Sequence, residues 1–158
     1  MAAKIIGFHV DLQRDRSLAQ KQILFLLEAL VNMHRAYLHR HPEAPSLYGS
    51  GVKYIGQEGK EEWYDYGEML ERGGGDCKIL GAARIAELRE RRKLGWQQVR
   101  PFLKWKRNKE RNFYLYHVQV QLTHPDGVIE IEDPSVKCGM HEYHRKRRLE
   151  GINDFPDL

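Results

Sequence analysis

The stretch GGGDCKILGAARIAELRERR (residues 73–92) places three glycines and an aspartate directly before one of the two cysteines in the chain. Glycines permit unusual backbone angles, and Asp76 has the short acceptor side chain favoured at a helix N-cap. From Ile79 onward the apolar residues follow a helical period, and basic residues gather before Gly95, where the helix dipole favours them. The stretch therefore predicts a helix whose first turn carries Cys77. A thiol in that position is favoured as the nucleophilic thiolate.

The second half of the chain predicts a β-sheet. Bulky apolar residues separated by polar connections indicate strands at residues 97–107, 112–124 and 128–132. The segment between the last two strands, residues 125–127, reads Pro-Asp-Gly, which suits a type I turn followed by a glycine bulge. The last two strands are therefore expected to pair as a hairpin.

The same turn sets the register of that hairpin. His124 then faces Val128, and counting back along both strands brings Gln119 opposite Asp133. His117 lies two residues from Gln119, on the same face of the sheet and diagonal to Asp133. The spacing thus allows a hydrogen bond between His117 and Asp133.

These positions suggest a chemistry for Cys77. Cys77 would attack an acyl carbon, His117 would act as general base and then general acid, and Asp133 would orient the imidazole. The backbone N–H of Cys77 is a candidate oxyanion donor, and Trp63 is a candidate for a second, substrate-side donor. The competing interpretation is that Cys77 is a small buried filler of the core and Trp63 an ordinary core or rim aromatic.

Three short motifs carry a family resemblance: GGGDCK at 73–78, YHVQV at 116–120 and IEDPS at 131–135. In this order they resemble the transglutaminase-like cysteine peptidase superfamily, in particular its small phage and bacterial members, over about residues 60–140. The resemblance implies an α+β fold with a papain-like core, in which the nucleophile helix packs on an antiparallel sheet. It assigns Cys77 as nucleophile, His117 as base and Asp133 as third member of a catalytic triad. It also implies peptidase, amidase or acyltransferase activity through a thioester, with hydrolysis favoured.

The N-terminal region predicts a long helix. Ser17 and Gln20 form a capping-box pattern, and the helical period runs to about Arg40, before His41-Pro42. A shorter helix is expected at about residues 60–72. We expect one domain over 1–158, with a helical extension at 1–55 that packs on the core or binds a partner, followed by a catalytic core at 60–140.

Composition narrows the environment and the partners. No segment approaches the roughly 18 apolar residues of a membrane span, and the N-terminus lacks a secretory pattern. We therefore expect a cytoplasmic protein with Cys77 and Cys138 as free thiols, acting on a protein or peptide substrate without a cofactor. Eleven Lys or Arg against three Glu between residues 84 and 112, and RKRR at 145–148, suit nucleic acid, an acidic protein surface or a virion interior, or a plain solvated surface. No nucleic-acid-binding motif accompanies this charge.

Two alternatives to an enzyme remain open. One is a structural protein that retains the fold and docks onto an assembly such as a phage particle through its helix and basic surfaces. The other is a metal site of Cys138, His141 and His144, completed by Asp76 or His117. Other residues have ordinary interpretations. Glu130 and Glu132 are expected on an exposed strand face, and an aromatic and aliphatic group is expected to build the sheet side of the core: Trp96, Phe102, Leu103 and Trp105.

Overall fold

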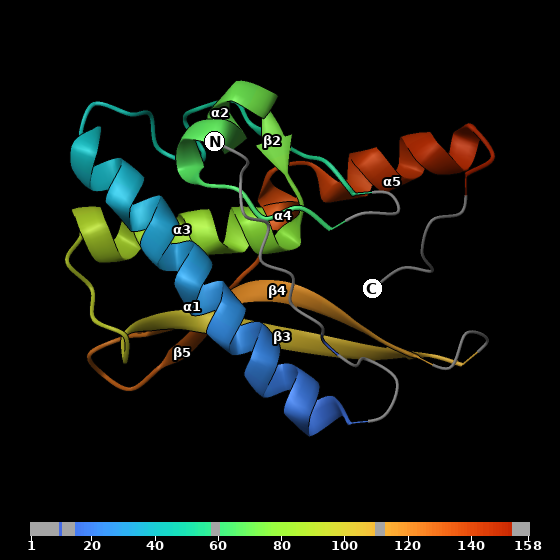
Figure 1. Ribbon diagram of the computed structural model, residues 1–158, viewed down its shortest axis with the longest axis horizontal. Helices are drawn as coiled ribbons and strands as arrows, with labels where there is room; N and C mark the ends of the chain where they lie inside the picture. The colour runs from blue at the N-terminus through green and yellow to red at the C-terminus, as the bar shows by residue number, and fades with distance from the viewer. Residues whose placement is uncertain (1–9, 11–14, 58–60, 110–112, 153–158) are drawn as a thin grey trace, which may run out of the picture.

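A computed structural model describes residue 10 and residues 15–57, 61–109, 113–152 of the chain. The fold is of the mixed α+β class, with an N-terminal helix and an antiparallel sheet (Figure 1). In chain order its elements are α1 (Arg16–Arg40), β1 (Lys53–Tyr54), α2 (Tyr66–Arg72), β2 (Gly74–Gly75), α3 (Cys77–Arg91), β3 (Val99–Asn108), β4 (Phe113–Thr123), β5 (Ile129–Glu132), α4 (Pro134–Lys137) and α5 (Met140–Leu149).

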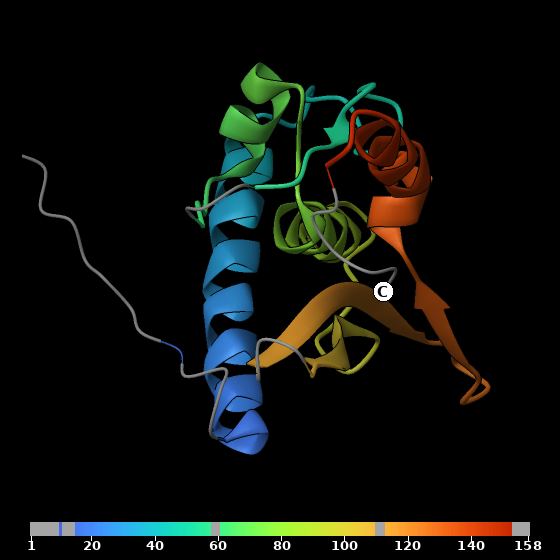
Figure 2. The ribbon, with the colours of Figure 1, turned by 90° about the vertical axis from the view of Figure 1, so that its right-hand side faces the viewer.

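Helix α1 runs along one side of the molecule and packs against α3 (Figure 2). It ends at Arg40, as predicted, but its N-cap differs from the prediction. Asp15, two residues before Ser17, accepts a hydrogen bond from the Leu18 backbone N–H at 3.0 Å. The buried side of α1 faces the core and consists of Ala19, Ile23, Leu27, Leu30, Val31, His34 and Leu38.

Strands β3, β4 and β5 form an antiparallel sheet in that order. The observed partners of β4 and β5, Val120 with Glu132 through Thr123 with Ile129, confirm the predicted register. Gly127 has φ +86° and donates its N–H to the His124 carbonyl, so the turn is the predicted one with a glycine in the left-handed region.

The glycines before Cys77 do more than end a helix. Gly73 is the left-handed C-cap of α2, whereas Gly74 and Gly75 form a parallel pair with β1. A Cβ at Gly74 would lie 1.9 Å from the Lys53 carbonyl oxygen, so only glycine fits there. The predicted helix over 60–72 is shorter than expected: residues 58–60 lie outside the described residues, and α2 begins at Tyr66 because Asp65 caps it.

Helix α3 packs against both α1 and the sheet and is buried over most of its length. A Cβ at Gly81 would lie 2.7 Å from Val118 Cγ1, which shows how closely α3 approaches β4. The prediction for the sheet side of the core is confirmed for two of its four residues. Leu103 is buried and Trp105 packs beside it, but Trp96 and Phe102 are 56% and 39% exposed. Trp96 instead donates its indole N–H to Glu28 on α1.

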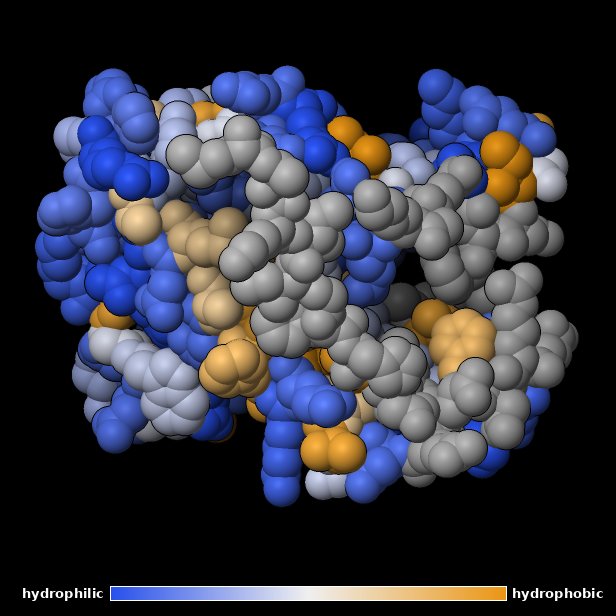
Figure 3. All heavy atoms as spheres, viewed as in Figure 1, coloured by the Kyte–Doolittle hydropathy of each residue, from blue (hydrophilic) through white to orange (hydrophobic). Residues whose placement is uncertain are grey.

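The surface seen in Figure 3 is mostly polar, with apolar colour along α1. Three large apolar side chains of α1 are exposed: Leu18, Phe25 and Met33. Among the described residues, no helix is both long enough and apolar enough to cross a membrane.

Candidate active site

Cys77 is the first residue of α3 and is half-buried. Asp76 caps the helix as predicted, because its side chain accepts a hydrogen bond from the Ile79 N–H at 3.3 Å. The backbone that leads into Cys77 is held by the β1 segment, because Ile55 donates its N–H to the Gly75 carbonyl at 2.9 Å. Figure 2 looks along α3 from the side of its first turn, with the sheet below it and α5 beside it.

His117 and Asp133 come from the sheet and from the start of α4. His117 lies near the middle of β4, opposite Lys104, and Asp133 directly follows β5 as the N-cap of α4. His117 Nε2 and Asp133 Oδ2 are 2.8 Å apart, which confirms the hydrogen bond that the spacing allows. Gln119 also donates to Asp133 Oδ2, at 3.0 Å, and the Val136 N–H binds Asp133 Oδ1 at 3.2 Å.

Gln119 is a further residue of the site, and its contact with Asp133 was not predicted. Its position opposite Asp133 in the register was the available signal, because a side chain there reaches the carboxylate. Burial works against the charged form of Asp133, but the bonds from His117, Gln119 and Val136 outweigh it and lower the pKa of the carboxyl. Asp133 is therefore held ionised and fixed in orientation.

Cys77 completes the cluster through His117. Burial alone would lower the pKa of His117, but the hydrogen bond with Asp133, the nearby Cys77 thiol and the negative charges of both groups raise it to about 9. Since Asp133 occupies Nε2, the nitrogen left for Cys77 is Nδ1. The structure thus brings Cys77, His117 and Asp133 together, with a hydrogen bond between His117 and Asp133. The catalytic roles assigned to them stay predictions.

A buried ion pair adjoins the nucleophile. The Lys78 side chain is 1% exposed, and its ammonium contacts the Asp76 carboxylate and lies 3.2 Å from Gln57 Oε1. The ammonium also lies 5.5 Å from the centre of the Trp63 ring. Trp63 packs on both hydrophobic clusters of the core, including the cluster that Cys77 contacts. Its proposed role as an oxyanion donor stays a prediction.

Two tyrosines near Cys77 were not found from the sequence. Burial, together with the charges of Cys77 and Asp76, raises the pKa of Tyr54 and of Tyr116 well above the ordinary value. Tyr116 donates its hydroxyl to Glu61 Oε1 at 3.3 Å. Tyr54 comes from the two-residue strand β1, which has no periodicity from which its position could be predicted.

Glu132, next to Asp133, is buried rather than exposed, so its prediction as a surface residue is wrong. Arg84 Nε lies 2.7 Å from Glu132 Oε1, and Tyr48 donates its hydroxyl to the same oxygen. Burial disfavours the carboxylate, but these two partners outweigh it and lower the pKa of Glu132. Glu132 is buried at the end of β5, where it pairs with an arginine of α3.

The alternative metal site is not formed. No group of three or more His, Cys, Asp or Glu side chains in the described part of the chain could hold a metal ion. Cys138 is buried, and burial raises the pKa of its thiol. His144 packs against the Tyr54 and Tyr143 rings, and both cysteines are free thiols.

Part of the basic stretch is used inside the molecule. Arg84 pairs with Glu132, Arg89 pairs with Glu28 and donates to the Val99 carbonyl, and Arg91 donates to the Ala44 carbonyl. These three arginines bind groups within the protein, so the number of basic residues in the sequence overstates the positive charge available to a partner. The predicted protein, virion and nucleic-acid partners stay predictions.

Comparisons with known proteins identify no relative. No family model matches the chain, and no curated protein or solved structure is significantly similar to it. What the site does is therefore inferred from its own geometry.

Proposed function

We propose that this protein is a cysteine hydrolase of the transglutaminase-like type, acting on peptide or amide bonds. The observation that carries the proposal is the row of Cys77, His117 and Asp133. The thiol lies in the first turn of a helix beside the His117 imidazole, and a carboxylate oxygen of Asp133 lies 2.8 Å from the Nε2 atom of that imidazole. This is the arrangement that nucleophilic catalysis by cysteine requires.

The reaction follows from these positions. Cys77 Sγ forms a bond to the acyl carbon, and the carbonyl electron pair moves to the oxygen. The intermediate collapses, the C–N bond breaks, and the leaving amine takes a proton from the His117 imidazolium, which leaves a thioester on Cys77. Water then attacks the thioester and gives its proton to His117. Breakdown releases the acid and regenerates the Cys77 thiolate beside the imidazolium, while Asp133 holds the ring throughout.

A papain-like core is part of this proposal. Helix α3 carries the nucleophile at its N-terminus and packs on β4 of an antiparallel sheet, and β4 carries the histidine. Both features support a transglutaminase-like arrangement. An amine in place of water as acyl acceptor would give a crosslink, and a glutamine side chain as substrate would give deamidation, from the same thioester.

A structural role in an assembly, such as a phage particle, is the second candidate. Phe25 is 70% exposed and Leu18 50% exposed on α1, and exposed apolar side chains on one helix favour a docking surface. This candidate predicts a Cys77 with ordinary reactivity, so one experiment separates the two.

The experiment measures alkylation of Cys77 by iodoacetamide as a function of pH. With its pKa at about 9, His117 is protonated at neutral pH and can stabilise a thiolate. We expect the wild type to react already at pH 6.5, where an ordinary thiol with a pKa of about 8.5 is only about 1% ionised. His117→Ala should therefore lower the rate at pH 6.5 by up to about 100-fold, and Asp133→Ala by less.

The chain offers a matched control. His124, in the turn after β4, pairs with Glu130 of β5 at 3.0 Å, but both side chains are about half exposed. His124→Ala should leave the alkylation profile unchanged, and Cys77→Ala measures the background from Cys138. Identical profiles for the wild type and His117→Ala would sink the proposed function.

A further inference from the structure

Tyr54 lies between the segment that carries the nucleophile and the segment that follows the acid. In the parallel pairing of β1 and β2 it is the partner of Gly75, two residues before Cys77. Neighbouring strands lie about 4.8 Å apart, which is within reach of a tyrosine side chain. The Tyr54 N–H donates to the Cys138 carbonyl at 2.8 Å, which ties β1 to the end of α4. Asp133 caps the other end of that helix.

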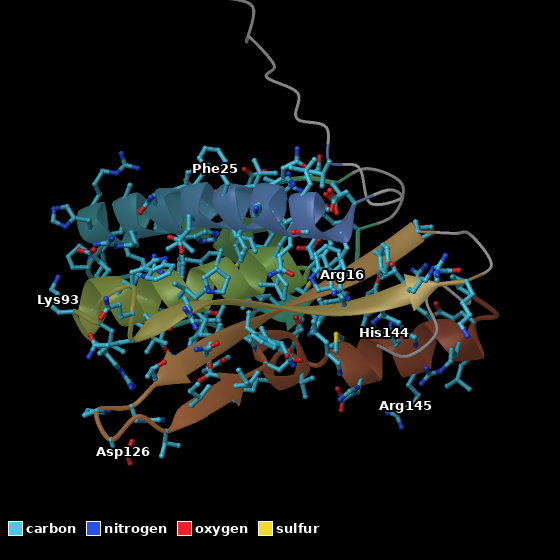
Figure 4. All side chains as sticks on the ribbon, turned by 90° about the horizontal axis from the view of Figure 1, so that it is seen from below. Arg16, Phe25, Lys93, Asp126, His144 and Arg145 are labelled. Carbon is cyan, nitrogen blue, oxygen red and sulfur yellow. The ribbon has the colours of Figure 1, made fainter. Side chains whose placement is uncertain are left out.

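The ring of Tyr54 is held in place by α5. Its centre lies 5.3 Å from the Tyr143 ring, in an edge-on contact, and 5.6 Å from the His144 ring. Figure 4 labels His144 and its neighbour Arg145 on α5, with Arg145 projecting into solvent. A ring held by two aromatic contacts presents its hydroxyl in a defined direction, so little reorganisation is needed when a ligand arrives.

The hydroxyl of Tyr54 is an unused donor. Among the described residues it forms no hydrogen bond, whereas the Tyr116 hydroxyl is engaged by Glu61. Burial and then the charges of Cys77, Asp76, Tyr143 and Asp133 raise the pKa of Tyr54 well above its ordinary value. The phenol therefore keeps its proton beside a site where negative charge gathers.

We propose that the Tyr54 hydroxyl is the second oxyanion donor of the site, acting together with the backbone N–H of Cys77. The first N–H groups of a helix have no partner within the helix, so the Cys77 N–H is available to a substrate oxygen. When Cys77 Sγ bonds to an acyl carbon, the carbonyl electron pair moves to the oxygen, and the Tyr54 O–H donates to it. This assignment rests on the proposed function of Cys77 as a nucleophile and replaces Trp63 as the donor.

Two reagents separate this role from activation of the thiol. p-Nitrophenyl acetate acylates Cys77: the S–C bond forms, an oxyanion develops, and the C–O bond breaks with release of p-nitrophenolate. Iodoacetamide alkylates Cys77: the S–C bond forms as the C–I bond breaks, and no oxyanion develops. The ratio of the two rate constants therefore reports oxyanion stabilisation alone, after subtraction of the Cys77→Ala background.

We expect Tyr54→Phe to lower this ratio at least tenfold, toward the roughly hundredfold effect of losing one oxyanion donor. Tyr143→Phe removes a hydroxyl from the neighbouring ring and should leave the ratio unchanged, and Trp63→Phe should do the same. An unchanged ratio in Tyr54→Phe overturns the proposal, as does a fall in the acylation and alkylation rates by the same factor, which would indicate a positioning role. A reduced ratio in Trp63→Phe with none in Tyr54→Phe would assign the donor to Trp63.

The ratio is measured at pH 7 and again at pH 10. At pH 10 an ordinary thiol, whose pKa is about 8.5, is ionised without help from an imidazole. Tyr54 still keeps its proton there, since its pKa is raised above the usual 10. A chain in which His117 fails to activate Cys77 would still reveal the Tyr54 effect at pH 10, so failure of the proposed function and failure of this inference are distinguishable.

Discussion

His34 is the residue at which burial and ionisation conflict most directly. It lies on α1 with 0% exposure, and neither ring nitrogen has a hydrogen-bond partner among the described residues. Burial lowers the pKa of the imidazole to about 3, against a smaller opposing effect of the Asp65 charge. The folded protein therefore keeps His34 neutral, whereas the unfolded chain takes up a proton below about pH 6.5. Stability is lost as the pH falls from 6.5 toward 3.

His34→Leu should remove this acid sensitivity. At pH 7.5 we expect the free energy of unfolding to rise by about 1–3 kcal/mol, because two unpartnered buried nitrogens are replaced by an apolar group of similar size. At pH 5 the gain should be larger, because the wild type then also loses the linkage contribution. Urea unfolding at both pH values measures it, with His141→Leu on the exposed side of α5 as control. Equal gains at the two pH values would contradict this account.

At the scale of elements, the parts predicted from sequence are those fixed by neighbours in the chain. The register of β4 and β5 follows from a three-residue turn, and with it the approach of His117 to Asp133. The cap of α3 at Asp76 follows from the four residues around it. Local rules were sufficient for these because a recognisable turn or cap sequence fixes each contact.

The parts that were missed depend on contacts distant in sequence or on equivalent local choices. Both Asp15 and Ser17 can cap a helix, and the sequence gives no reason to prefer the earlier one. The pairing of β1 with β2 joins two dipeptides about twenty residues apart, too short to show a period. Glu132 turns inward because of Arg84, 48 residues away. The position of Tyr54 near Cys77 was not predicted either, because it depends on the β1–β2 pair.

The first turn of α3 depends on one buried charge pair, and a double-mutant cycle tests it. Lys78→Met leaves the Asp76 carboxylate without its cation, and Asp76→Asn leaves the ammonium unpaired while the amide oxygen can still cap the helix. We expect each single variant to lose about 3 kcal/mol of unfolding free energy, because an uncompensated buried charge is costly. The double variant should lose less than either one. Additive losses, measured by urea unfolding, would show that the two side chains act independently.

At the scale of the whole molecule, α1 is part of the core rather than an appendage. The sequence left open whether residues 1–55 pack on the core or bind a partner, and the described part packs. Arg89 of α3 binds Glu28 of α1 through two hydrogen bonds at 2.7 and 3.0 Å and also donates to the Val99 carbonyl of β3. Ile23 and Leu27 share a cluster with Leu103 and Val118 of the sheet. Helix α1, helix α3 and the sheet are thereby joined through Arg89 and through one shared apolar cluster.

One buried and one exposed truncation on α1 test whether these shared contacts make unfolding cooperative. Leu27 is 1% exposed, whereas Phe25 is 70% exposed and lies on the outer side of the helix (Figure 4). Leu27→Ala should lower the free energy of unfolding by about 2–5 kcal/mol, and Phe25→Ala by less than about 0.5 kcal/mol. Far-ultraviolet circular dichroism follows the helices, and fluorescence follows the three tryptophans, of which Trp63 and Trp105 pack on the cluster that contains Leu27. The two signals should shift together in Leu27→Ala, because removing one buried side chain weakens the sheet and the helix equally.

Separate transitions would instead make α1 an independent unit. In that case the reactivity of Cys77, which packs on the same cluster, would survive the loss of α1 structure.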